Sequence, residues 1–214
     1  MESNKNNIIK VNSTIQSTTV PNAFEMSDNE KIEKIAKHFK FIMQTLGLDL
    51  SDDSLKETPK RVAKMYVSEI FSGLDPRNKP EVTLFQNNYG YNQMLVEKNI
   101  SVYSMCEHHF VPIIGKAHVA YIANSKVIGL SKIHRIVKYF SKRPQVQERL
   151  TRQIMENLKQ TLNIDDVAVV IDARHMCVEC RGVEDVTSNT ITSSISGQFQ
   201  QDTTRSEFMR FIGM

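Results

Sequence analysis

The order of hydrophobic patterns between residues 81 and 198 constrains the fold more than any other feature of the chain. Two extended stretches rich in Val, Ile and Tyr come first, at residues 94–105 and 116–122. Two stretches with apolar residues at helical spacing follow, and two further extended stretches, 167–173 and 187–198, complete the series. Two hairpins that bracket a pair of helices predict an α+β domain with an antiparallel four-stranded sheet and helices on one of its faces.

Such a sheet would have two open edges, which a protein must cover or pair. Pairing the edges between subunits would make a barrel and would require oligomerisation. The two helices between the hairpins are separated by Pro144, and we expect the first to open at Ser131, after a short apolar stretch at 127–130. A further extended stretch is expected at 81–85, and Phe208 and Phe211 suggest a last short helix.

The segment before this series is helical. Ser27 and Glu30 have the spacing of a capping box, apolar residues follow at helical intervals, and Gly47 is a fitting end. A second helix is expected to begin with Thr58 as its cap. We therefore predict a flexible arm at 1–26 and one domain at 27–214, with a helical part at 27–75 and a second part at 80–214 that contains the sheet.

Composition limits the classes of function. The chain of 214 residues has 27 Lys and Arg against 24 Asp and Glu, a net charge of +3 that is too mild for general nucleic-acid binding. We find no apolar stretch long enough for a transmembrane helix and no secretory signal in the first 19 residues, so we expect no membrane partner. An odd number of cysteines, three, predicts a reducing compartment and a cytoplasmic location.

Two short segments carry thiols and imidazoles together, the ligand set that zinc prefers. Cys106 and His109 are spaced so that one turn can present both, and Cys177 and Cys180 lie in the second segment. A structural site would use four protein ligands and a catalytic site three, and spacing does not choose between them. A redox pair of Cys177 and Cys180 is the other interpretation, although that motif usually opens a helix.

Further residues suggest acid–base chemistry and anion binding. His108 and His175 flank the metal segments, where a histidine can move protons near neutral pH. Lys132 and Arg135, one helical turn apart at a helix start, and Arg181, beside the second metal segment, favour a polyphosphate. For Glu148, early in a helix, a favourable dipole contact is the simpler interpretation, and recognition of a purine edge is the alternative.

Several motifs together resemble GTP cyclohydrolase I of the zinc-dependent type, over roughly residues 30 to 214. They are Cys106-Glu-His-His109, Gly129-Leu-Ser-Lys132, Arg143-Pro-Gln-Val-Gln-Glu148-Arg-Leu, His175-x-Cys177, Arg181-Gly182, Thr58-Pro-Lys-Arg-Val-Ala-Lys-Met-Tyr66 and Glu69-Ile-Phe-Ser-Gly-Leu74. The resemblance implies the tunnelling fold and a toroidal homodecamer with active sites at subunit junctions. It also implies conversion of GTP and water to 7,8-dihydroneopterin triphosphate and formate.

The resemblance also implies a role for each motif residue. The Zn²⁺ ligands would be Cys106, His109 and Cys177. His108 and His175 would move protons, and Ser131 would lie near the ribose. Glu148, helped by Gln147, would hold guanine, and the triphosphate would be held by Arg61, Lys132, Arg135 and Arg181.

Two positions depart from the family pattern, Cys180 and His134, where the family more often has other residues. A fourth thiolate would displace water from the metal, so we expect Cys180 not to be a ligand. We expect little effect of His134 on the reaction class. The alternatives are a related tunnelling-fold enzyme acting on another purine or pterin, and a non-catalytic nucleotide-binding protein with a closed four-ligand zinc site.

Overall fold

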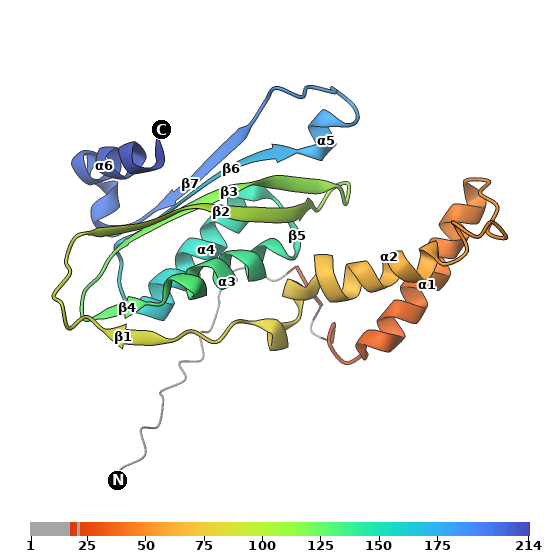
Figure 1. Cartoon of the computed structure of the whole chain (residues 1–214), viewed down its shortest axis with the longest axis horizontal. Coiled ribbons are helices and arrows are strands. Elements are labelled where there is room, and N and C mark those ends of the chain that lie inside the picture. The colour runs from red at the N-terminus through yellow and green to blue at the C-terminus, as the bar shows by residue number, and fades with distance from the viewer. Residues whose placement is uncertain (1–17, 21) are drawn as a thin grey trace, which may run out of the picture.

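A five-stranded sheet forms the centre of the computed structural model, which describes residues 18–20 and 22–214 (Figure 1). Its strands are ordered β5-β2-β3-β6-β7. They are β2 (Met94–Cys106), β3 (Pro112–Ile122), β5 (Pro144–Gln145), β6 (Val167–His175) and β7 (Thr190–Ile195). The four antiparallel strands predicted from the sequence are present, and the two-residue β5 adds a parallel pairing with the end of β2.

The last predicted strand is shorter than expected. Strand β7 ends at Ile195, and the 3₁₀ helix η4 (Gly197–Gln200) takes up the remainder of the predicted stretch 187–198. The carboxylate of Asp166 accepts a hydrogen bond of 2.7 Å from the backbone N–H of Gln198, which turns the chain away from the sheet. Gly197 has a φ of +57° at this turn, a conformation that glycine adopts without strain.

The stretches expected to be extended at 81–85 and 127–130 pair with each other. Strands β1 (Leu84–Gln86) and β4 (Lys126–Ile128) form a separate antiparallel pair. Helix α3 (Leu130–Ser141) begins directly afterwards with Gly129 as its N-cap, so it opens one residue before the predicted Ser131.

Helices α3 and α4 (Gln147–Leu162) cover one face of the sheet (Figure 1). Their buried residues, among them Ile133, Ile136, Leu150 and Ile154, join the strand residues Val167, Val169 and Ile171 in one core. Successive strand residues point to opposite faces, so Ala168 and Val170 lie on the other side of the sheet. There they pack with Phe199, Phe208 and Ile212 in a second cluster.

Helix α6 (Asp202–Ile212) therefore lies on the face opposite α3 and α4 (Figure 1). The expectation of helices on only one face was wrong. A C-terminal helix with buried Phe208 was predicted, but alternation along a strand cannot say which face such a helix will cover. Phe211 is half exposed.

Two antiparallel helices at the N-terminal side extend away from the sheet (Figure 1). Helix α1 (Asp28–Thr45) has the predicted capping box between Ser27 and Glu30. Helix α2 (Thr58–Met65) is capped by Glu57 without a side-chain bond, so Thr58 is its first residue and not its cap. Single turns of other helix types follow: η1 (Tyr66–Ile70), η2 (Ser72–Leu74) and η3 (Pro76–Asn78).

Most of the predicted N-terminal arm, 1–26, falls outside the described residues, which here are 18–20 and 22–26. Over the described part of the chain, no helix combines the length and hydrophobicity needed to cross a bilayer. The sheet keeps two edges. Within the described residues, β7 pairs only with β6, and the outer side of β2 pairs with β5 only at Met105 and Cys106.

Candidate active site

Cys106, His109 and Cys177 come together at one end of the sheet. Cys106 is the last residue of β2, His109 lies in the turn to β3, and Cys177 lies in the short helix α5 (Met176–Glu179) after β6. Because Ile113 of β3 is aligned with His175 of β6, the register brings these segments side by side. The three ligand atoms all lie within 4.8 Å of one another, so this group could hold a metal ion.

The turn that carries Cys106 and His109 is closed by backbone hydrogen bonds. Cys106 N–H donates to the carbonyl of Val111 at 2.8 Å, and Phe110 N–H donates to that of Cys106 at 2.9 Å. Phe110 adopts a φ of +54°, which is uncommon for a bulky residue. Its ring packs edge-on against Phe71 with centroids 5.2 Å apart, and this contact helps to hold the strained conformation.

The chemistry of the three side chains suits a soft divalent cation. Burial raises the pKa of the Cys177 thiol, and the neighbouring Cys106 raises it further. Two adjacent thiols resist ionising together, whereas a cation between them would favour both thiolates. Two thiolates and an imidazole fit Zn²⁺ and leave its fourth position open.

Cys180 is not a member of this group among the described residues. It is exposed, and its thiol donates a hydrogen bond of 2.8 Å to the carbonyl of Met176, one helical turn before it. The cysteine that contacts Cys177 is Cys106, so the redox pair of Cys177 and Cys180 finds no support. The geometry favours three protein ligands over four.

The two candidate proton-transfer histidines flank the Cys-His-Cys group. His108 Nδ1 lies 3.8 Å from Cys106 Sγ, and the His108 ring is exposed. His175 is half buried, and burial lowers its pKa, while the Glu148 carboxylate acts in the opposite direction. Glu148, exposed in the first turn of α4, therefore lies near His175 and the metal group.

Gln147 is used differently from the sequence-based expectation that it helps hold guanine. The residue is 1% exposed, and its Oε1 lies 2.7 Å from His175 Nε2. Its Nε2 donates to the carbonyls of Ile171 and Thr190 and to Thr192 Oγ1. The amide is thus surrounded by protein groups on both of its ends.

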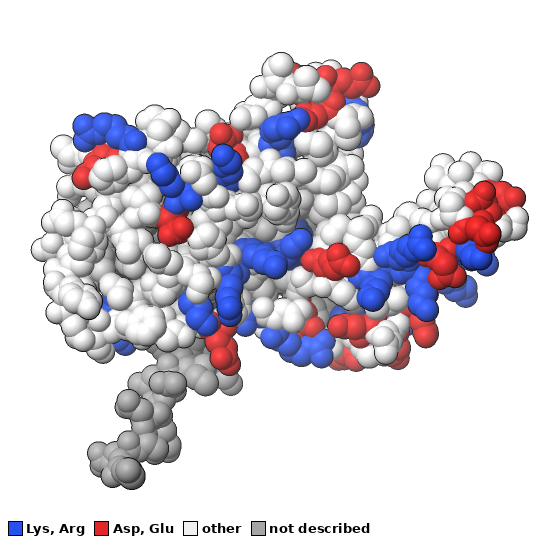
Figure 2. Space-filling model, in the orientation of Figure 1, with Lys and Arg blue, Asp and Glu red and all other residues white. Residues whose placement is uncertain are grey.

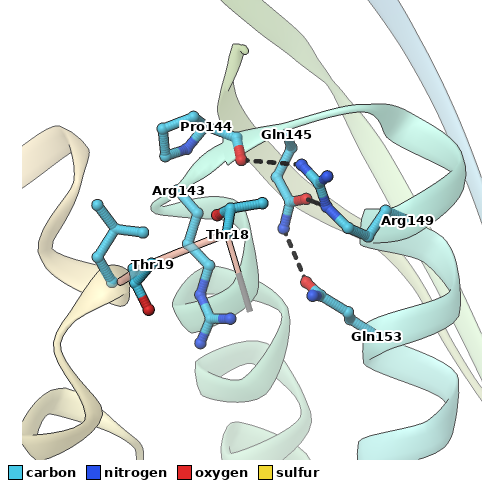
Figure 3. A pocket seen from close by; sticks show the side chains of 8 residues that line it. Thr18, Thr19, Arg143, Pro144, Gln145, Arg149 and Gln153 are labelled. Carbon is cyan, nitrogen blue, oxygen red and sulfur yellow. Dashed lines mark hydrogen bonds between the residues drawn. The ribbon is translucent and has the colours of Figure 1, made fainter. Parts of the chain in front are cut away.

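A second set of polar contacts was missed in the sequence (Figure 3). Arg149 pairs with Glu107, which lies between Cys106 and His108, and its Nε donates to Gln145 Oε1 at 3.0 Å. Gln145 in turn donates to Gln153 at 2.9 Å, and its backbone carbonyl accepts from Glu107 N–H at 3.0 Å. The sequence could have indicated this ion pair, because Glu107 lies in the Cys106–His109 motif and Arg149 in the motif that begins at Arg143.

The predicted anion-binding residues do not all gather at the metal group. Ser131, Lys132 and Arg135 lie in the first turns of α3, beside β4, whereas the metal group lies at the opposite end of the sheet (Figure 1). Helix α3 has 12 residues, a length of about 18 Å. On the face of the molecule shown in Figure 2, Lys and Arg side chains lie along the region where Figure 1 shows α3.

The other predicted cations differ in their distance from the metal group. Arg181 is exposed but close enough to Cys177 to lower the pKa of its thiol. Arg61 is exposed on α2, where Figure 2 shows mixed charges. His134, on α3, contacts Glu97 at 3.1 Å and is not a member of the Cys-His-Cys group found among the described residues.

The fold and this site define an α+β protein with a Cys-His-Cys group that could hold a metal ion, between two histidines, at the end of an open-edged sheet. Within that class, the model of the family GTP cyclohydrolase I matches residues 35–213, and the chain belongs to this family.

Curated relatives are similar over nearly the whole chain. It is 59% identical to GTP cyclohydrolase 1 of Flavobacterium johnsoniae over 190 residues, which are 89% of this chain and 85% of the relative. It is 53% identical to GTP cyclohydrolase 1 of Vibrio vulnificus strain YJ016 and 55% identical to that of Aeromonas salmonicida strain A449. Each of these two matches covers 91% of this chain and 89% of the relative.

Proposed function

We propose that the protein converts GTP and water to 7,8-dihydroneopterin triphosphate and formate, the first step of tetrahydrofolate and pterin synthesis. Membership of the GTP cyclohydrolase I family supports this function. The observation that carries it is the convergence of Cys106, His109 and Cys177 within 4.8 Å, with His108 and His175 beside them.

Zn²⁺ is the cofactor that this donor set favours, with Cys106, His109 and Cys177 as its ligands. When bound, zinc supplies the Lewis acidity that makes water a nucleophile near neutral pH. The exposed side of His109 leaves the group accessible to substrate and water. Cys180 stays outside the ligand set.

The histidines supply and remove the protons that the reaction requires. One water adds at C8 of guanine and the first C8–N bond breaks, which leaves a formamide. A second water hydrolyses the remaining C8–N bond and releases formate, and the final ring closure returns one water, so the overall reaction consumes one. Each departing ring nitrogen must gain a proton, so two histidines on different segments can act at different moments. His108 and His175 take these roles, and Ser131 contacts the ribose during its rearrangement and ring closure.

Guanine recognition is assigned to Glu148. A carboxylate accepts two parallel N–H bonds, and the guanine edge offers that pair of donors whereas adenine does not. Glu148 is exposed at the start of α4 and close to His175, so a ligand can reach the carboxylate.

The triphosphate is assigned to Arg61, Lys132, Arg135 and Arg181. Lys132 and Arg135 lie at the other end of α3 from the metal group of the same chain. A single site that uses both ends therefore requires two copies, one supplying the first turns of α3 and its neighbour the metal group. The two open sheet edges favour the same assembly, a closed barrel in a homo-oligomer, which we take to be a decamer.

The partners are accordingly GTP, water and further copies of the chain, with neither nucleic acid nor membrane involved. Three free cysteines, two of them in the metal group, suit the reducing cytoplasm.

The test is formate release from GTP by the purified protein, with ATP as the control nucleotide. We expect formate from GTP alone, its loss after chelation, and its return with added Zn²⁺. Absence of formate from an oligomer shown to contain zinc would contradict the proposal and favour the non-catalytic nucleotide-binding protein.

A further inference from the structure

The side-chain amide of Gln147 can form hydrogen bonds with its neighbours in only one orientation. One end of the amide faces the carbonyl oxygens of Ile171 and Thr190, at 3.0 and 2.8 Å. Carbonyl oxygens only accept hydrogen bonds, so that end must be the NH₂ group. The amide oxygen therefore lies at the other end, 2.7 Å from Nε2 of His175.

This orientation determines which ring nitrogen of His175 carries a hydrogen. Because an amide oxygen only accepts, Nε2 of His175 must be the donor in their contact. In the neutral ring the single N–H is then on Nε2, and Nδ1 keeps its lone pair. Whether the ring is neutral or charged, Nε2 is engaged with Gln147, and Nδ1 is the nitrogen that can exchange a proton with a ligand.

The amide is held from three elements, so it cannot easily reverse. Gln147 is 1% exposed on α4, Ile171 lies on β6, and Thr190 and Thr192 lie on β7. Thr151 strengthens the arrangement, since its Oγ1 donates to the backbone carbonyl of Gln147 at 2.7 Å and lies 2.6 Å from Thr192 Oγ1. A reversed amide would set oxygen against oxygen in a buried environment.

We propose that Gln147 is a positioning residue: it holds the Nε2–H tautomer of His175, so that this histidine exchanges protons with the substrate through Nδ1. The inference deepens the proposed function and rests on it for the identity of the substrate. It replaces direct contact with guanine as the role of Gln147, because the amide NH₂ group donates to carbonyl oxygens of the protein and the amide oxygen accepts from His175.

The tautomer of the His175 ring can be determined without measuring enzyme activity. Zinc-loaded protein with ¹⁵N-labelled histidine is examined by solid-state NMR, and the His175 signals are identified by their loss in His175→Asn. We expect the hydrogen of the neutral ring on Nε2 in the wild type. A neutral ring with its hydrogen on Nδ1 would overturn the proposal, and this outcome needs no variant of Gln147.

The variant Gln147→Met keeps the side-chain length. It removes the hydrogen bond with His175 and the hydrogen bonds to the carbonyls of Ile171 and Thr190. We expect the His175 ring to populate both tautomers in this variant. Asn157→Leu is the matched control, since Asn157 is a buried amide on the same helix whose Nδ2 has no partner among the described residues. It should leave the His175 spectrum unchanged. An unaltered spectrum in Gln147→Met would overturn the proposal.

Steady-state kinetics with GTP give a second readout. We expect Gln147→Met to lower kcat by about 10- to 100-fold and to change KM by less than about threefold, as for other residues that orient a functional histidine. A raised KM with unchanged kcat would instead indicate a guanine contact and overturn the proposal. Protein with the expected tautomer but no formate release would refute the proposed function alone.

Discussion

Arg149 of α4 forms an ion pair with Glu107, the residue between Cys106 and His108 in the turn after β2. Both side chains are largely buried, and the Arg149 guanidinium also contacts the side chain of Gln145 and the carbonyl of Pro144. The helix that carries Glu148 and Gln147 is thereby tied to the turn that carries two of the three candidate metal ligands. Contacts of this kind orient ligands and affect metal affinity.

Replacement of Arg149 tests this connection. Arg149→Met removes the ion pair and leaves Glu107 partly buried without its partner, so we expect zinc affinity to fall by about 10- to 100-fold. Competition with a chromogenic chelator measures the affinity. Arg152→Met, an exposed arginine on the same helix, is the control and should behave as wild type. Equal affinities for the two variants would show that the ion pair does not support the turn.

Glu148 is predicted to select guanine. Glu148→Ala should lower kcat/KM for GTP by about 10⁴-fold, because a site built on paired hydrogen bonds loses strongly when its acceptor is removed. Zinc content should be unchanged, since Glu148 is not a member of the metal group. Glu156→Ala, on the same helix, is the matched control. If Glu148→Ala retained GTP binding and turnover, guanine recognition would have to be assigned elsewhere.

Cys180 and Cys177 should respond differently to the same substitution. Cys180→Ser should keep zinc content and activity near wild type, since its thiol donates to the carbonyl of Met176 and Cys180 is not in the Cys-His-Cys group of the described residues. Cys177→Ser should lose most of its zinc, because Cys177 belongs to the group within 4.8 Å. Metal analysis of the two purified variants gives the result, and loss of zinc from Cys180→Ser would argue for a four-ligand site.

A site shared between copies predicts complementation. Lys132→Ala removes a proposed triphosphate contact and Glu148→Ala removes the proposed guanine contact, so oligomers of either variant alone should be inactive. The two residues lie at opposite ends of the sheet in the same chain. In oligomers assembled from equal amounts of both chains, about one site in four should receive an intact α3 end from one copy and an intact metal end from its neighbour. Co-expression followed by a formate assay measures this. No recovery of activity in mixed oligomers would place each site within one chain.

Local features were predictable because they depend on neighbouring residues. The capping box of Ser27 and Glu30 and the Cys-x-x-His turn lie within three residues, and the structure contains both. The α+β order of strands and helices followed from hydrophobic periodicity. The first residues of β2 and β6 and the last residue of β3 are as predicted, whereas β3 begins at Pro112 instead of residue 116. At the end of β7, the prediction missed because the distant side chain of Asp166 binds the backbone of Gln198. At α2, helical hydrogen bonding already begins at Glu57, whose backbone carbonyl accepts from Arg61 N–H at 3.0 Å, so Thr58 is inside the helix.

The sequence by itself determined which chemical groups are present, the family they resemble and the order of the elements. Only the tertiary structure decided that Cys177 joins Cys106 while Cys180 does not, and that Gln147 faces His175. It also decided that the first turn of α3, which carries Lys132, and the metal group of one chain lie at opposite ends of the sheet. These relationships depend on strand register and on which face each helix covers, and both are set by packing between residues far apart in the chain.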